Sequence, residues 1–222
     1  DAALEGMWKA LPDTVKGCGN TIVVADGSGS MTVRVGGTDV SALEVANSLA
    51  IYFAERSSGE FKDKYITFSE RPQFVDLSQG KNLREKLAIA RMHNEVANTN
   101  IEAVFDLILS TAVSNHMSQE DIPANILIVS DMEFDSCATS GAPATRSSYG
   151  WYMSSRVRPT EALFETIEKK YRAAGYKLPR LVFWNVNSRT GTIPVKENDL
   201  GVALVSGFSV NIVNMVMSNK LD

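Results

Sequence analysis

Carboxylate and hydroxyl side chains gather at a few points of the sequence, each next to an apolar run. The stretch TIVVADGSGSM, residues 21–31, places Asp26 directly after the apolar residues and then alternates Ser28 and Ser30 with glycine. The stretch NILIVSD, residues 125–131, ends in Asp131, and Thr99 stands just before the apolar run of residues 100–109. This set of oxygen donors, without imidazole or thiolate, favours a hard divalent cation such as Mg²⁺, with Mn²⁺ or Ca²⁺ as alternatives, over zinc.

Each part of this set also has a simpler interpretation. DGSGS by itself is typical of a glycine-rich turn that caps a helix. Thr99 by itself is typical of a helix N-cap, a role that is compatible with metal binding. A site that keeps the residues but binds metal weakly is a further alternative.

The elements that must position these side chains follow from the hydrophobic pattern. Short β-branched runs alternate with amphipathic ones, which predicts an α/β fold. We expect strands over residues 21–25, 65–68, 72–77, 125–130, 180–186 and 201–206. We expect helices over residues 39–57, 100–115, 160–175 (with Thr160 as the N-cap and Gly175 at the end) and 207–218. Residues 187–199 are too polar and turn-rich for a helix, so we expect an extended excursion or a hairpin there.

The strands predict how the carboxylates meet. Near-continuous apolar strands such as NILIVS are typical of a mostly parallel sheet covered by helices on both faces, which is a doubly wound fold. In such sheets ligands bind beyond the carboxyl ends of the strands, where the strand order reverses. If the first and fourth strands flank that point, Asp26 and Asp131 lie in one crevice.

Composition limits the class of protein. With 222 residues, of which 44% are hydrophobic, the chain has the size of one globular domain. We expect that domain over residues 17–222, and we expect residues 1–16 to be a lead-in that ends a preceding region. No apolar run reaches the roughly 18–20 residues of a membrane span, and the first residues, DAALEGMWKALPD, lack the basic-then-apolar order of a secretory signal. The isolated Cys18 and Cys137 fit a reducing compartment, so we expect a cytoplasmic protein.

Motifs for catalysis are missing from the sequence. The stretch ADGSGS lacks the G-x-S-x-G arrangement of a nucleophile elbow, and no G-x-x-x-x-G-K-[ST] phosphate loop occurs. A phosphotransferase that used Asp26 as its nucleophile would carry a second acid two residues later, where this chain has Ser28. We therefore expect a binding module rather than an enzyme.

The order Asp26, Ser28, Ser30, Thr99 and Asp131 resembles the metal-ion-dependent adhesion site of von Willebrand factor type A (VWA) domains, over residues 17–218. The resemblance implies a Rossmann-like, six-stranded sheet of order 3-2-1-4-5-6. It also implies that the two serines and the threonine ligate Mg²⁺, that the two aspartates hold its water shell, and that an acidic group of a protein partner completes the site.

Two positions depart from the pattern of VWA domains. Ala97 and Asn98 stand where Gly-Gly is usual, and Met132 replaces the glycine after the last aspartate. Neither change removes a ligand atom. Both leave open whether the site switches when it binds a ligand.

Two further stretches resemble a narrower group of VWA domains. The approach MWKALPD through Met31 is similar to that of the Ro ribonucleoprotein autoantigens, in which an RNA-binding ring of helical repeats precedes the VWA domain. Residues 181–216 look like the C-terminal part of an uncharacterised family with a Ro-like VWA domain. This resemblance implies an alternative function, in which the domain is the VWA part of a Ro-like, RNA-binding ribonucleoprotein and assists in binding RNA or a partner.

A long connection, residues 136–158, follows Asp131 and is expected on the rim of the site. Its arginines and aromatic residues suit stacking on RNA bases or anchoring a protein partner. The equal alternative is that its aromatic residues pack on the body of the domain. The net charge of −4 does not favour RNA, although nine basic residues and three acids fall within residues 146–189. The candidate contacts are Arg146, Tyr149, Trp151, Tyr152, Arg156 and Arg158.

Overall fold

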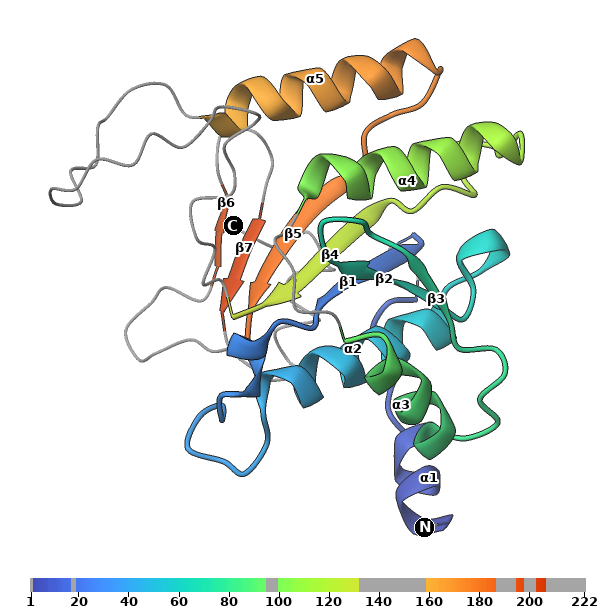
Figure 1. Cartoon of the computed structure of the whole chain (residues 1–222). Helices are drawn as coiled ribbons and strands as arrows, with labels where there is room; N and C mark the ends of the chain where they lie inside the picture. Colours follow the sequence, from blue (N-terminus) through green and yellow to red (C-terminus); the bar gives the residue numbers. More distant parts are fainter. Residues whose placement is uncertain are drawn as a thin grey trace, which may run out of the picture.

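The computed structural model describes residues 2–16, 19–94, 100–131, 159–186, 195–197 and 203–206. Figure 1 shows a mixed α/β arrangement, with a central sheet between two layers of helices. The strands are β1 Thr21–Asp26, β2 Lys64–Phe68, β3 Phe74–Asp76, β4 Asn125–Ser130, β5 Arg180–Asn185, β6 Val195–Glu197 and β7 Ala203–Ser206. The helices are α1 Ala2–Lys9, α2 Ala42–Arg56, α3 Leu83–Met92, α4 Ile101–Ser114 and α5 Pro159–Ala173, with short 3₁₀ turns η1 Gly29–Thr32 and η2 Gly59–Phe61.

The sheet is mostly parallel, as the sequence predicts. Its order is β3-β2-β1-β4-β5-β7-β6, so β1 and β4 are neighbours and the order reverses between them. β3 pairs antiparallel with β2. β1 pairs in parallel with β2 and with β4, and β5 pairs in parallel with β4 and with β7. The expected count of six strands is wrong for the described residues, which form seven. The additional strand is β6, which pairs antiparallel with β7. Its residues 195–197 are the described part of the stretch 187–199, for which an extended excursion or a hairpin was expected, and they are extended.

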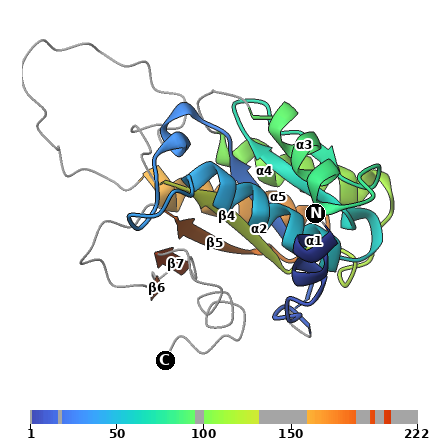
Figure 2. The same cartoon turned by 90° about the horizontal axis from the view of Figure 1, so that it is seen from below.

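Two apolar clusters cover the two faces of the sheet. Side chains alternate along β1, so Val23 and Ala25 pack toward α2 while Ile22 and Val24 pack toward α4. Figure 2 looks onto the layer that holds α1, α2 and α3, and α4 and α5 lie on the far side of the sheet. This double cover is why β1 and β4 are buried along their whole length.

The helices expected over residues 39–57 and 100–115 are α2 and α4, with ends that differ by up to three residues, whereas α1 and α3 were not expected. α5 begins at Pro159, so Thr160 lies within the helix and is not its N-cap. Proline suits the first helical position because its fixed φ is helical and its missing N–H has no partner to lose there. The expected helix over residues 207–218 lies outside the described residues. No described helix has the length and apolarity that crossing a membrane requires.

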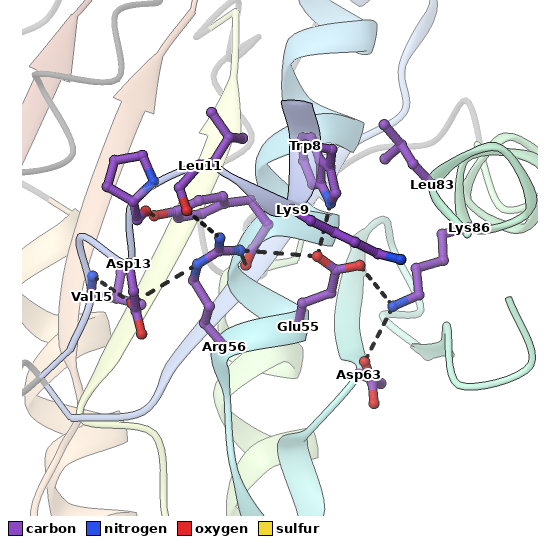
Figure 3. Close-up of polar contacts among 12 residues, drawn as sticks. Trp8, Lys9, Leu11, Asp13, Val15, Glu55, Arg56, Asp63, Leu83 and Lys86 are labelled. Carbon is purple, nitrogen blue, oxygen red and sulfur yellow. Dashed lines mark hydrogen bonds and ion pairs between the residues drawn. The ribbon is translucent and has the colours of Figure 1, made fainter. Parts of the chain in front are cut away.

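Residues 2–16 pack along α2 and α3 at the amino edge of the sheet (Figure 3). The Trp8 indole N–H donates to Glu55 at 2.9 Å, and the guanidinium of Arg56 lies 3.7 Å from the centre of the Tyr52 ring. Lys86 of α3 pairs with Glu55 at 2.8 Å. We call these five residues, Trp8, Tyr52, Glu55, Arg56 and Lys86, the N-terminal clamp.

Candidate metal centre

Asp26 is the last residue of β1, and both of its carboxylate oxygens accept a hydrogen bond. The Ser28 backbone N–H donates to Oδ1 at 2.8 Å. The hydroxyl of Ser130, the last residue of β4, donates to Oδ2 at 2.6 Å. Because β1 and β4 pair in parallel, Ser130 reaches Asp26 across the sheet. Asp26 and Ser130 are both buried, so these are short, charge-assisted bonds shielded from water.

Ser28 and Ser30 lie in the turn that follows β1, and both are half-buried. Their hydroxyl oxygens are 3.0 Å apart. Ser28 occupies the N-cap position of η1, but its side chain makes no capping hydrogen bond. The turn therefore brings the two hydroxyls together, and the capping interpretation of DGSGS does not account for the Ser28 side chain.

Asp131 directly follows β4 and is buried, with 6% of its surface exposed. Its backbone N–H donates to the sulfur of Met31 at 3.1 Å. Met31 is fully buried in the core between the sheet and α2. A thioether is a weak acceptor, so this contact mainly fixes the position of the backbone. Met31 thus ties the turn after β1 to the end of β4.

Thr99 lies outside the described residues, but the next residue is described. The Asn100 side chain accepts the Ala103 N–H at 3.0 Å and so caps α4. Asn100 is thus the N-cap of α4, and the roles considered for Thr99 lie outside the described residues. The Asn100 N–H donates to the Ser69 carbonyl oxygen at 3.3 Å, which brings the start of α4 to the carboxyl end of β2. The six candidate contacts within residues 146–158 also lie outside the described residues.

Ser130, Met31 and Ser69 belong to this edge and were not predicted. Ser69 follows β2, is 1% exposed, and its hydroxyl has no hydrogen-bond partner in the part of the chain that the structure describes. Leaving a buried hydroxyl unsatisfied costs about 1–3 kcal/mol. In the sequence, Ser69 and Ser130 are marked only by their place at the carboxyl end of an apolar strand, which is too common to predict a role at the site.

The donors at this edge fit a cation of the Mg²⁺ type. Asp26 and Asp131 supply carboxylates and Ser28 and Ser30 supply hydroxyls, which are hard oxygen ligands. Among the described residues, no three His, Cys, Asp or Glu side chains come together. A cation held here would therefore rely on hydroxyls and water for most of its ligands.

Comparisons with known proteins give a family and a protein of similar fold, and none of them names an activity. The family model named "Domain of unknown function (DUF7788)" matches residues 20–222. The chain is 31% identical to the uncharacterized protein L728 of Acanthamoeba polyphaga mimivirus, over 98% of this chain and 34% of that protein. The fold of this chain is similar to that of the Ro (RSR) protein of Deinococcus radiodurans, with a TM-score of 0.57 and 15% sequence identity. The match covers 96% of this chain and 36% of the Ro protein. The chain therefore spans about a third of the length of the mimivirus protein and about a third of the length of the Ro protein.

Proposed function

The chain belongs to the family described as a domain of unknown function (DUF7788), and from its site we propose a metal-dependent ligand-binding module. The observation that carries this proposal is the arrangement of Asp26. Its carboxylate is buried and oriented by two donors, beside a pair of hydroxyls 3.0 Å apart and within reach of the end of β4. A purely structural turn has no need of so many oxygen atoms at one edge.

In this proposal the residues divide the work. Ser28, Ser30 and Thr99 ligate Mg²⁺, and Asp26 and Asp131 hold its water shell. A bound Mg²⁺ supplies a positive centre that attracts an oxygen ligand. The carboxylate of an acidic side chain on a protein partner takes the remaining position. The module binds and does not catalyse.

A metal titration tests the first half of this proposal. Mg²⁺ at about a hundred times its Kd stabilises the folded state by about 2.7 kcal/mol, which is a rise in Tm of about 5–10 °C for a domain of this size. Asp26→Ala should lose that rise. Glu168→Ala, which removes an acid from the exposed face of α5, should keep it. An equal response of wild type and Asp26→Ala to Mg²⁺ would refute the proposed site.

An acidic peptide tests the second half. Binding of a Glu-containing peptide to the Mg²⁺-loaded protein should disappear when EDTA is added. It should change little between low and moderate salt, because direct coordination depends less on screening than surface charge does. Binding that persists in EDTA would show that the protein holds the peptide without the metal.

A second candidate function is the VWA part of a ribonucleoprotein. The similarity in fold to a Ro protein favours it. Structured RNA should then bind with an affinity that falls steeply with salt, because the phosphate contacts release counterions. Substitution of Arg146, Arg156 and Arg158 should reduce that salt dependence. RNA binding that is absent at low salt would exclude this candidate.

A further inference from the structure

Ser69 lies at the same edge as the candidate metal centre. It directly follows β2, which pairs in parallel with β1 so that Phe68 is opposite Asp26. Ser69 is therefore one residue beyond the level of Asp26, on the neighbouring strand. Its carbonyl oxygen accepts the N–H of Asn100, which places the beginning of α4 against it.

The hydroxyl of Ser69 is exceptional among the buried serines. The described residues contain three buried serines, Ser57, Ser69 and Ser130. The Ser57 hydroxyl donates to the Thr21 carbonyl oxygen at 3.0 Å, and that of Ser130 donates to Asp26 at 2.6 Å. The Ser69 hydroxyl is the one without a partner in the described structure. An alanine would fit the same space without burying an unsatisfied polar group, so the hydroxyl lowers the stability of the metal-free protein.

We infer that Ser69 is a further residue of the candidate metal centre, and that its hydroxyl hydrogen-bonds to the water shell of the bound cation. This inference rests on the function proposed above. A native protein keeps few buried polar groups unsatisfied, and those at a site are typically satisfied by water or an ion. A water of that shell would lie between the Ser69 hydroxyl and the carboxylate of Asp26, because their strands are neighbours. Ser69 acts on the cation through that water and is not a direct ligand.

The test compares Ser69→Ala with Ser57→Ala in the 222-residue chain, with the metal ions Mg²⁺ and Mn²⁺ as the probes and no partner added. Ser57 is a matched control because it is buried and hydrogen-bonded at the opposite, amino edge of the sheet. Thermal melts in EDTA measure the metal-free stability. Calorimetric titration with Mg²⁺ measures the affinity, and competition with Mn²⁺, followed by its electron paramagnetic resonance, provides a second readout.

Ser69→Ala should raise the Tm of the metal-free protein by about 2–12 °C and weaken Mg²⁺ binding about tenfold. Ser57→Ala should lower the Tm and leave the affinity unchanged. A serine with a purely structural hydrogen bond cannot give both a higher Tm and weaker Mg²⁺ binding, because loss of that hydrogen bond would lower the Tm.

Two results would overturn the inference while the proposed function stands: unchanged Mg²⁺ affinity in Ser69→Ala, or a lowered Tm of that variant in EDTA. If the wild type binds no Mg²⁺ in either assay, the proposed function fails and the role of Ser69 fails with it. The Asp26→Ala titration identifies this last case separately.

Discussion

The carboxylate of Asp26 is oriented without any cation. One oxygen accepts from the turn after β1 and the other from the last residue of β4, so two different strands fix one side chain. Each carboxylate oxygen has a second lone-pair direction that can accept a hydrogen bond from water. A cation arriving here would meet an ordered acceptor, and little reorganisation would be required.

Removing the hydroxyl of Ser130 should disturb this arrangement. Ser130→Ala leaves Oδ2 of Asp26 without its 2.6 Å donor, so we expect a loss of about 1.5–3 kcal/mol of stability and about tenfold weaker Mg²⁺ binding. Ser130→Thr keeps the hydroxyl and should retain most of the affinity. Urea unfolding and metal titration measure the two effects. Equal affinities in the alanine variant and the wild type would show that the orientation of Asp26 does not matter to metal.

The sequence motif predicted that two aspartates and two serines lie at this edge of the sheet. It did not predict the residues that contact them. Ser130 and Met31 look like an ordinary strand end and an ordinary core residue in the sequence. Their contacts depend on the parallel register of β1 and β4, which brings residues about a hundred positions apart into hydrogen-bond distance. A single sequence records neither the register nor the depth of burial.

At the scale of elements, α2 begins at a capping box next to the candidate site. The Ser41 hydroxyl accepts the Glu44 N–H, and the Glu44 carboxylate accepts from the Ser41 backbone N–H at 2.9 Å. The Ala42 N–H donates to the Val33 carbonyl oxygen, which connects the helix to the turn that carries Ser28 and Ser30. The start of α2 and the position of that turn are therefore set together.

The capping box predicts a dependence on pH. The hydrogen bond from the Ser41 backbone lowers the pKa of Glu44 below its ordinary value of 4.5. A group with a lowered pKa contributes stability above its unfolded value, and that contribution is lost as pH falls through the folded value. Glu44→Gln should therefore melt about 1–3 °C lower than the wild type at pH 7. The difference should close below pH 4.5 in thermal melts, and a difference that stays constant down to pH 3 would contradict this role.

The sequence pattern predicted most elements because burial on one or both faces requires a regular period. It missed α1 and α3: α1 has no buried side chain and α3 buries only Ala90, so burial constrains their sequences little. It placed Thr160 before α5 because a hydroxyl is a common cap, whereas Pro159 itself begins the helix. The short β6 exists through its antiparallel pairing with β7, which no local pattern records.

At the scale of the whole molecule, the described residues include a polar region at each of two opposite edges of the sheet. The candidate metal centre lies at the carboxyl edge, and the N-terminal clamp lies at the amino edge (Figures 1 and 3). Within the clamp Lys86 also lies 3.6 Å from Asp63, so this lysine joins α3 to α2 and to the start of β2. A cation at one edge should leave the other largely unaffected.

Two backbone amides allow this separation to be measured. The Ser28 N–H donates to Asp26 at the carboxyl edge, and the Leu83 N–H donates to Glu5 at the amino edge, each to a carboxylate. With Mg²⁺ at about a hundred times its Kd, hydrogen exchange at Ser28 should slow by up to about a hundredfold, while exchange at Leu83 through local opening should be unchanged. Equal slowing at both amides would mean that metal acts on global stability instead.

One element nevertheless touches both edges. α2 has 15 residues, a length of about 22 Å at 1.5 Å per residue. Its first residue is bonded to the turn of the candidate site, and its last two turns carry Tyr52, Glu55 and Arg56 of the clamp. The two ends of one helix therefore contact the two polar regions, so the spacing between these regions is set by the length of α2.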